Sequence, residues 1–507
     1  MRMKMFLFLI LPLFVTVSVR SQSTVDLLIK DTAGPQISRY IYGQFAEHLG
    51  RCVYEGLWKD NKFRMEVVNA LKKIKIPVLR WPGGCFADQY HWRDGVGPRE
   101  QRKKTVNTQW GMVMDNNSFG THEFLELCSM LGCEPYIAAN VGTGTPEEME
   151  SWLEYLNYPG ESTLTDLRKK NGRQEPWNVT IWGVGNENWG CGGWMTPEYY
   201  AMLYRRYSRF CRRFNGQPMK LIACGAENDD YNWTEGVMKN ILLRATWGIG
   251  VHYYIIPGDP NGIHGSATQF DEDGYFKAMT ACLKMEELIN KHLAIMDKYD
   301  TLKKVALVMD EWGIATDVEP GTRPEFHYQQ NSLRDGLIAA TALNIFNNHA
   351  DRIKMANLAQ VVNVVQALIL TEGDKMLLTP TYHIFDMYKV HQDAHLLALK
   401  FNSPDYVYGQ QKLPAVNASA SRDSLGAVHI SLVNIDANKP VTIRTSLHGL
   451  PSKSIQGQIL TSEKVNDINT FDHPDKVHLA DFTGAYKEGG NLVITLPARS
   501  VVMVELK

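Results

Sequence analysis

Along most of the chain, short runs rich in β-branched and aromatic residues alternate with longer stretches whose apolar positions repeat with the period of a helix. The short runs end in polar or Gly-rich turns, which is typical of strands buried in a parallel sheet. Eight runs are expected to be strands: Tyr40 to Phe45, Pro77 to Trp81, Glu134 to Asn140, Val179 to Gly185, Lys220 to Cys224, Ile249 to Tyr254, Val305 to Met309 and Ile353 to Val361. Eight strands in succession, separated by helical stretches, predict a (β/α)8 barrel, also called a TIM barrel.

Six of the helical stretches can be placed, and two of them begin at a Pro that directly follows a Thr, a pair that suits the start of a helix. They are Lys62 to Lys73, His122 to Leu131, Pro146 to Tyr155, Pro197 to Arg213, Phe276 to Lys298 and Ser332 to Asn347.

The pattern changes beyond about residue 395 to alternating strands separated by Asn, Gly and Pro turns. Examples are Ala427 to Asn434, Val441 to Ser446 and Asn491 to Leu496. This part is expected to be a C-terminal β-sandwich. The segment Ser23 to Asp31 resembles an edge strand and is expected to join it. The predicted division is therefore an N-terminal strand region over 23–39, a catalytic barrel over 40–394 and a sandwich over 395–507.

The first residues have the composition of a secretory signal. Arg2 and Lys4 precede an apolar run from Met5 to Val17, and small and polar residues follow. A membrane anchor is the alternative, but the run is short for a spanning helix, so no stable membrane span is expected. This pattern predicts a signal peptide over 1–22, cleaved near Ser21 to Ser23, and an exported protein that is periplasmic or secreted.

Composition excludes some classes of protein. The 507 residues are 44% hydrophobic and 21% charged, with a formal net charge of -2, so no basic surface for nucleic acid is expected. The eight Cys are scattered and lack paired CxxC spacing, which argues against a Cys/His metalloprotein. Buried free thiols are favoured over a disulfide framework, and no structural metal is expected.

Two of the expected strands deliver a carboxylate to their carboxyl ends, where the active sites of such barrels lie. The fourth leads to Asn186 and Glu187, and the seventh to Asp310 and Glu311. Hydrolysis of a glycosidic bond needs an acid and a second carboxylate, and a separation of roughly 5 Å predicts retention of configuration. A single such Glu is more often a solvated loop charge, but two at opposite sides of one rim favour a catalytic pair. Strand alternation places Asp310 on the face opposite Glu311, so Glu311 is the expected pocket residue.

Other strand ends carry candidate binding residues. Glu47 follows the first strand and can bind sugar hydroxyls, although a structural salt bridge is equally compatible with the sequence. Arg80 in the second strand is expected to hold a catalytic carboxylate in its ionised form. His252 and Tyr254 in the sixth share a face, so Tyr254 can hydrogen-bond the nucleophile, with core packing as the alternative.

Several motifs of the chain match those of one known family. They are GQFAEHLGRCVYEGLW (43–58), LRWPGGCFADQYHWRDGVGP (79–98), WGVGNENWGCGG (182–193), VHYY (251–254), MDEWG (309–313) and NLAQVVNVVQALILTEG (357–373). The chain resembles the α-L-arabinofuranosidases of glycoside hydrolase family 51 over nearly its whole length after the signal.

The resemblance implies that Glu187 is the general acid/base and Glu311 the nucleophile of a retaining, exo-acting enzyme that needs no cofactor. Its substrates would be arabinan, arabinoxylan or derived oligosaccharides, and its assembly a homohexamer. It further implies that the terminal arabinofuranose lies in a subsite formed by Glu47, Asn186, Tyr254 and Gln360, with Cys85 beside them. Gln366 lies on the same segment as Gln360, and some relatives carry Asn at the position of Cys85.

Two other functions remain to be distinguished. An endoglucanase or β-xylosidase can use the same scaffold and carboxylate pair. An open cleft lined by several Trp would favour attack within a glucan, and the candidates near the rim are Trp81, Trp92, Trp110, Trp189, Trp194 and Trp312. A carbohydrate-binding protein on an inactive barrel would have lost one of the two carboxylates, but both are present.

Overall fold

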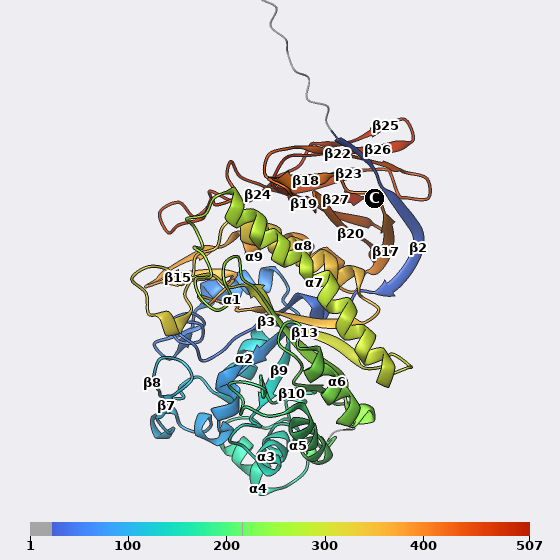
Figure 1. Cartoon of the computed structure of the whole chain (residues 1–507). Coiled ribbons are helices and arrows are strands. Elements are labelled where there is room, and N and C mark those ends of the chain that lie inside the picture. Colours follow the sequence, from blue (N-terminus) through green and yellow to red (C-terminus); the bar gives the residue numbers. More distant parts are fainter. Residues whose placement is uncertain (1–22, 215) are drawn as a thin grey trace, which may run out of the picture.

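The computed structural model describes residues 23–214 and 216–507 of the chain (Figure 1). At its centre, eight parallel strands form a closed barrel in which each strand pairs with the next and the last pairs with the first. The strands are β3 (Gly43–Phe45), β6 (Val78–Trp81), β9 (Glu134–Ala139), β10 (Ile181–Val184), β11 (Lys220–Ala223), β12 (Gly248–Ile255), β13 (Ala306–Ile314) and β14 (Ile353–Ala359). The predicted barrel is confirmed. The signal peptide predicted over 1–22 lies outside the described residues.

The interior of the barrel is filled by side chains. Six strands each contribute one buried residue to a compact cluster: Val78, Tyr136, Ile181, Ile222, Val308 and Met355. Because side chains alternate along a strand, Arg80 points to the same interior face as Val78, two residues earlier. Leu79 and Trp81 point outward into the apolar layer beneath the helices. A filled barrel leaves only its ends for a binding site.

Helices surround the barrel. They are α1 (Met65–Lys73), α2 (Thr121–Leu131), α3 (Pro146–Asn157), α4 (Thr163–Lys170), α5 (Pro197–Phe210), α6 (Tyr231–Asn240), α7 (Glu272–Tyr299), α8 (Leu333–Asn348) and α9 (Pro380–Tyr388). Thr145 and Thr196 accept hydrogen bonds from backbone N–H groups in the first turns of α3 and α5, which both begin with Pro. The six predicted helices are present, whereas α4, α6 and α9 were not predicted.

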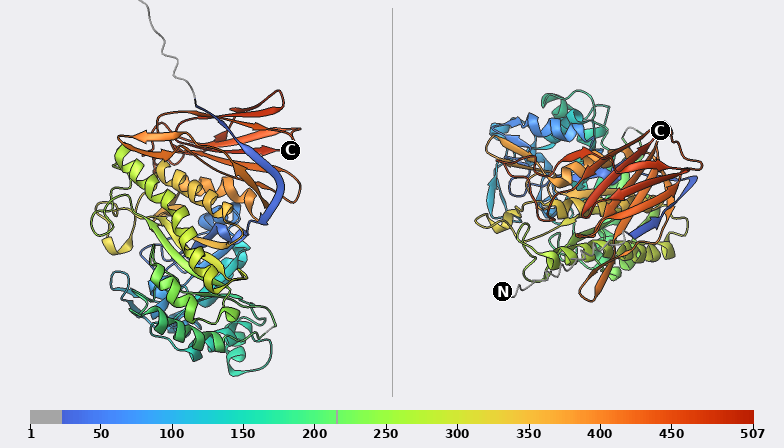
Figure 2. Two further views of the ribbon diagram at one scale, coloured as in Figure 1. Left: turned by 45° about the vertical axis from the view of Figure 1, so that its right-hand side comes forward. Right: turned by 90° about the horizontal axis from the view of Figure 1, so that it is seen from above.

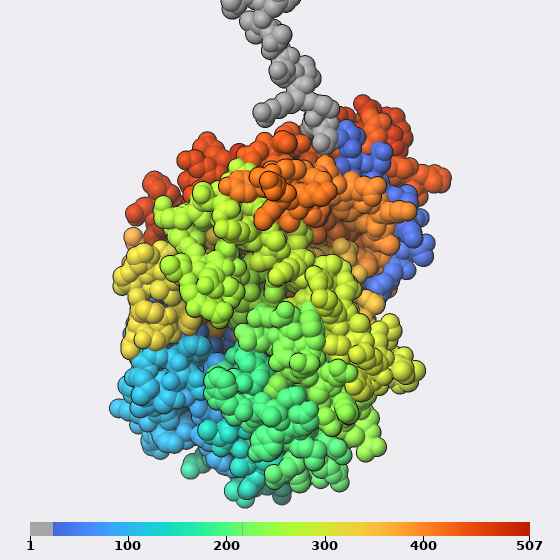
Figure 3. All heavy atoms as spheres, in the orientation of Figure 1, coloured from blue at the N-terminus to red at the C-terminus, as the bar shows by residue number. Residues whose placement is uncertain are grey.

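Two antiparallel-rich sheets form the C-terminal β-sandwich (Figure 2). The smaller sheet has the order β1-β22-β26-β25, and the larger has the order β2-β17-β20-β21-β27-β23-β24. Their strands are β1 (Ser23–Asp26), β2 (Leu28–Gln36), β17 (His395–Lys400), β20 (Val416–Arg422), β21 (Val428–Asn434), β22 (Val441–Ser446), β23 (Ile455–Leu460), β24 (Leu479–Asp481), β25 (Ala485–Glu488), β26 (Asn491–Leu496) and β27 (Ser500–Leu506). The first strands of the described chain, β1 and β2, therefore lie at an edge of each sheet, where they pair with β22 and β17. Figure 3 shows the blue atoms of the N-terminal segment against the orange and red atoms of the C-terminal part.

Helix α8 lies between the barrel and the larger sheet. Almost every residue of this helix is buried, as expected for a helix that is covered on all sides. Its polar side chains are paired across the boundary: Ser419 Oγ in β20 donates to Asn344 Oδ1, and Asn347 Nδ2 donates to Ser419 Oγ. The barrel and the sandwich thus share one apolar layer.

None of the helices in the described part of the chain combines the length and the apolar character that crossing a membrane requires.

Candidate active site

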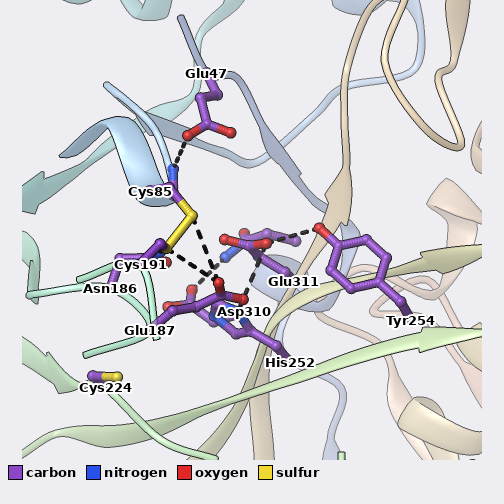
Figure 4. Close-up of polar contacts among 12 residues, drawn as sticks. Glu47, Cys85, Asn186, Glu187, Cys191, Cys224, His252, Tyr254, Asp310 and Glu311 are labelled. Atoms are coloured by element: carbon purple, nitrogen blue, oxygen red, sulfur yellow. Dashed lines mark hydrogen bonds and ion pairs between the residues drawn. A yellow bond between two sulfur atoms is a disulfide. The ribbon is translucent and has the colours of Figure 1, made fainter. Parts of the chain in front are cut away.

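A cavity opens at the carboxyl ends of the barrel strands, where parallel strands bring their last residues together (Figure 4). It has a volume of about 230 Å³. Its lining includes seven residues predicted from the sequence: Glu47, Cys85, Asn186, Glu187, Tyr254, Glu311 and Gln360. Arg80 and His252 lie directly behind them and contact the carboxylates.

Glu187 and Glu311 face one another across this cavity. One carboxylate oxygen from each, together with a ring nitrogen of His252, lies within 4.8 Å of the others. His252 Nδ1 is 2.9 Å from Glu187 Oε1 and 3.7 Å from Glu311 Oε2. This spacing is close to the roughly 5–5.5 Å between the carboxyl groups of retaining glycosidases and shorter than the roughly 6.5–9.5 Å of inverting ones, so it fits a retaining mechanism.

Glu311 is buried and held on both oxygens. Arg80 Nη1 donates to Oε1 at 2.6 Å, and Tyr254 Oη donates to Oε2 at 2.7 Å. Burial favours the neutral acid, but the positive charges of His252 and Arg80 and the two hydrogen bonds outweigh it, so the pKa of Glu311 lies below its usual value. The carboxylate is therefore ionised, as a nucleophile must be.

Arg80 connects the two strands that carry the carboxylates. Its Nη2 donates to Asn186 Oδ1 at 2.6 Å, while Nη1 binds Glu311, and its guanidinium lies over the ring of Phe45 at 4.5 Å. Because the guanidinium is planar and rigid, bridging the two residues fixes the side chains of Asn186 and Glu311 relative to one another.

Asp310 differs from the prediction. The expected alternation placed it on the face opposite Glu311, but its Oδ2 accepts from Tyr136 in the barrel interior, and Arg80 Nε lies 3.9 Å from Oδ1. The reason is a β-bulge: Val251 pairs with Met309 and the next residue, His252, pairs with Glu311, which leaves Asp310 unpaired. Both carboxylates therefore point inward, although only Glu311 lines the cavity.

His252 lies beside both catalytic candidates. Burial lowers its pKa, but the negative charge of Glu311 and the contact with Glu187 raise it above the ordinary value. A protonated imidazole donates from Nδ1 to Glu187 Oε1. The ring thereby fixes Oε1 of Glu187, whose side chain lines the cavity.

Glu47 is bound by three donors. The backbone N–H groups of Gly84 and Phe86 donate to Oε1 at 2.9 Å, and Gln360 Nε2 donates to Oε2 at 3.1 Å. Burial and the charge of Glu311 raise the pKa of Glu47 to about 7. Gln366 is the alternative to Gln360. Its Oε1 instead accepts a hydrogen bond from the backbone N–H of Ile314, and it does not line the cavity.

Two glycines allow the backbone to approach these carboxylates. A Cβ on Gly83 would lie 2.8 Å from Glu47 Oε1, and one on Gly84 would lie 2.7 Å from Glu311 Oε1. Both distances are shorter than any side chain tolerates without displacing its neighbour. The Gly-Gly pair is therefore required by the close packing of the site.

Cys85 is not the free thiol that the sequence favoured. It forms a disulfide with Cys191, with an S–S distance of 2.08 Å, across 106 residues of chain. The two residues follow β6 and β10, and only the closed barrel brings those loops together. The other six cysteines are unpaired.

Asp88 was missed by the sequence reasoning. Its carboxylate accepts from the backbone N–H groups of Val141, Gly142 and Asn186, and from Asn188 Nδ2. Despite these donors, burial raises the pKa of Asp88 to about 7. The residue holds the loop that carries Glu187, and the signal that could have found it was an acidic residue four positions after Gly84, close to the carboxyl end of a barrel strand.

Aromatic residues line this cavity sparsely. Of the rim candidates, Trp81, Trp92 and Trp312 are fully buried in packing, and Trp110 is the tryptophan that lines the cavity. The lining residues that were not predicted include Glu227, Asn228, His264 and His327. A small cavity with one tryptophan differs from the open, Trp-lined cleft expected for attack within a glucan.

Known proteins resemble the chain over both of its parts. Residues 70–273 match the family described as Alpha-L-arabinofuranosidase 1 domain, and residues 310–500 match the Alpha-L-arabinofuranosidase C-terminal domain. A relative from Bacteroides ovatus, named intracellular exo-alpha-L-arabinofuranosidase, is 48% identical over 502 residues, which are 97% of each chain.

Solved structures agree with this result. The crystal structure of the GH51 arabinofuranosidase from Xanthomonas axonopodis pv. citri superposes with a TM-score of 0.93 at 47% identity, covering 96% of this chain and 100% of that one. An arabinose complex of alpha-L-arabinofuranosidase from Thermotoga maritima has a TM-score of 0.83 at 31% identity, covering 95% and 99%.

One prediction is contradicted by these comparisons. The sequence led us to expect an exported protein, but the Bacteroides ovatus relative, which matches 97% of the chain, is named as an intracellular enzyme. The prediction of export is wrong on this finding. A basic start followed by an apolar run was therefore not sufficient to assign the compartment.

Proposed function

The chain belongs to the α-L-arabinofuranosidases of glycoside hydrolase family 51, and we propose that Glu187 and Glu311 are the carboxylates that carry out its reaction. The activity is the retaining, exo-acting hydrolysis of terminal non-reducing α-L-arabinofuranosides. The observation that supports the assignment of the two residues is their separation: oxygens of the two side chains lie within 4.8 Å at the mouth of the barrel.

In the first step, Glu311 attacks the anomeric carbon of the terminal sugar while Glu187 gives a proton to the glycosidic oxygen. Arg80 and Tyr254 keep Glu311 ionised and directed at the cavity. The bond between the anomeric carbon and the leaving oxygen breaks, and an arabinofuranosyl ester forms on Glu311.

In the second step, Glu187 acts as a base. Having lost its proton to the leaving group, it removes a proton from water, which attacks the same anomeric carbon and releases Glu311. Two inversions restore the original configuration. The negative charge of Glu311 is absent while the ester exists and returns when the sugar leaves, so Arg80 and His252 again neutralise it.

We propose that Glu47, Asn186 and Gln360 bind the hydroxyl groups of the terminal sugar. Glu47 is buried, lines the cavity and already accepts hydrogen bonds from three donors, so it is rigidly placed to accept a fourth from a hydroxyl. A cavity of about 230 Å³ is small for a ligand pocket, whose range is roughly 300–1,000 Å³. This size suits one monosaccharide, and the natural sources of that sugar would be arabinan, arabinoxylan or their oligosaccharides.

Two further features are proposed from the pattern of the chain and the family resemblance. The first is a division into an N-terminal strand region over 23–39, a catalytic barrel over 40–394 and a sandwich over 395–507. The second is assembly as a homohexamer, for which light scattering of the purified protein would give the mass directly.

The roles of the two carboxylates are tested by comparing wild type, Glu187→Ala and Glu311→Ala on p-nitrophenyl α-L-arabinofuranoside, with and without azide. The β-D-xylopyranoside and β-D-glucopyranoside serve as alternative sugars. We expect preference for the arabinofuranoside, azide rescue of Glu187→Ala with a retained-configuration product, and almost no activity for Glu311→Ala.

The matched control for this experiment is Glu463→Ala, which removes an exposed glutamate of the sandwich. It should keep the wild-type rate. Near-normal rates for Glu187→Ala or Glu311→Ala would contradict the assignment, and a preference for xylose or glucose would contradict the substrate.

A further inference from the structure

The disulfide between Cys85 and Cys191 joins the two loops on one side of the cavity. Cys85 follows the Gly pair after β6, and Cys191 lies in the turn after β10, four residues beyond Glu187. Figure 4 shows the bridge beside the carboxylate of Glu187. The other cysteines of the chain are unpaired, so this covalent link is specific to the catalytic loops.

The bridge contacts one particular oxygen of Glu187. Cys191 Sγ lies 3.3 Å and Cys85 Sγ 3.7 Å from Oε2, whereas His252 Nδ1 lies 2.9 Å from Oε1. The sulfur atoms of a disulfide carry no hydrogen and cannot donate to Oε2. The carboxyl group is therefore held by a donor on Oε1 and by packing against sulfur on Oε2, which is the oxygen left to carry the transferable proton.

The backbone at Glu187 needs this support. Its φ angle of 42° lies in the left-handed region, which is unfavourable for a residue with a side chain. The carbonyl of Glu187 accepts from the N–H groups of Gly190 and Gly192, which closes a tight turn around Cys191. Tying Cys191 to the β6 loop thus fixes the turn that directly follows Glu187.

We propose that the Cys85–Cys191 disulfide positions Glu187 for proton transfer, and that it acts on the acid step rather than on the general stability of the barrel. This inference rests on the proposed role of Glu187 as the acid/base. Opening the bridge would free the turn and the Oε2 side of the carboxyl, and displacements of about 1 Å in a catalytic group typically cost on the order of 100-fold in rate.

Two substrates whose leaving groups differ in their need for an acid can show whether the disulfide positions Glu187 or only stabilises the fold. A p-nitrophenolate leaves without much help from an acid, whereas the alcohol leaving group of methyl α-L-arabinofuranoside must be protonated. The ratio kcat/KM reports glycosyl transfer to Glu311, so later steps do not enter the comparison. The test is to measure kcat/KM on both substrates for wild type and for the double variant Cys85→Ser/Cys191→Ser.

We expect the double variant to lose about 100-fold on the methyl glycoside and only a few-fold on the p-nitrophenyl glycoside. The control is Cys133→Ser, which removes an unpaired cysteine at the start of β9 and should leave both values unchanged. An equal loss on both substrates, or no loss on either, would overturn the proposal.

Glu187→Ala, measured in parallel, distinguishes the two proposals. If Glu187→Ala shows the leaving-group dependence and the double cysteine variant does not, the disulfide has no positioning role but the acid/base assignment stands. If Glu187→Ala itself loses activity equally on both substrates, the assignment of the acid is wrong.

Reduction tests the same inference without a mutation that could affect folding. Dithiothreitol converts the bridge into two thiols and is itself oxidised to a cyclic disulfide. After reduction, wild type should lose kcat/KM on the methyl glycoside selectively, and reoxidation should restore that activity. The circular dichroism spectrum should stay the same throughout. Wild-type activity that is indifferent to reduction, with the free thiols verified by titration, would overturn the proposal.

Discussion

At the scale of the residue, the site depends on how each carboxylate is paired. Glu187, Glu311, Glu47 and Asp310 lie close together, and like charges in a buried region oppose one another. Arg80 forms ion pairs with Asp310 and Glu311. The pKa of Glu47 rises to about 7, which reduces the negative charge of that residue near neutral pH. Glu47 and Glu311 therefore coexist because their surroundings shift their pKa values in opposite directions.

The ionised state of Glu311 should contribute to folding stability. Its pKa is lowered in the folded protein, so this contribution is complete above the ordinary glutamate pKa of about 4.3 and is lost as the pH falls through the lowered value. Measured by urea unfolding between about pH 7 and about pH 3, wild type should lose stability relative to Glu311→Gln as the pH falls. Glu463→Gln, at an exposed position, is the control. A difference between wild type and Glu311→Gln that does not change with pH would contradict the lowered pKa.

Gly84 should be important for both activity and stability. An added Cβ would lie 2.7 Å from Glu311 Oε1, and this oxygen is held by Arg80 and cannot move freely. Gly84→Ala is expected to reduce kcat/KM by about 100-fold and the free energy of unfolding by about 1–3 kcal/mol. Gly490→Ala, where a Cβ meets nothing within 4 Å, should have no effect on activity. Full activity in Gly84→Ala would mean that Glu311 is less tightly held than described.

At the scale of the element, the strand ends were predictable and the details of pairing were not. Hydrophobic periodicity located all eight barrel strands, and the rule that active sites lie at their carboxyl ends placed Glu187 and Glu311 at one rim. The orientation of Asp310 could not be predicted, because the bulge that turns it inward depends on how β13 pairs with β12. The Cys85–Cys191 disulfide could not be predicted either, because the two cysteines are 106 residues apart in the sequence and meet only when the barrel closes.

The N-terminal strands are expected to stabilise the sandwich without affecting catalysis. Leu27, between β1 and β2, is 4% exposed and packs in the core between the two sheets. Leu27→Ala should reduce the free energy of unfolding by about 2–5 kcal/mol, as large-to-small changes in a core do. Its neighbour Leu28 is 53% exposed, so Leu28→Ala should have little effect.

Thermal or urea unfolding would measure this difference, with kcat/KM of the folded proteins compared at a lower temperature. A loss of activity in folded Leu27→Ala would show that the sandwich contributes to the active site.

At the scale of the whole molecule, the barrel and the sandwich are joined by packing rather than by a flexible linker. Helix α8 is buried between them, and the first strands of the described chain pair with strands from its end. The catalytic cavity belongs to the barrel alone: its lining residues come from barrel strands and the loops that follow them. The sandwich therefore supports the catalytic part through α8 and contributes no residue to the cavity.

The account predicts a covalent intermediate on one residue of this molecule, and trapping it is the most direct test. Glu187→Ala should form the arabinofuranosyl ester from p-nitrophenyl α-L-arabinofuranoside and release it slowly, because no base activates water. Mass spectrometry of the rapidly quenched protein, followed by peptide mapping, should find one added pentosyl group on Glu311. A label on any other residue, or retained turnover without any label, would contradict the assignment of Glu311 as the nucleophile.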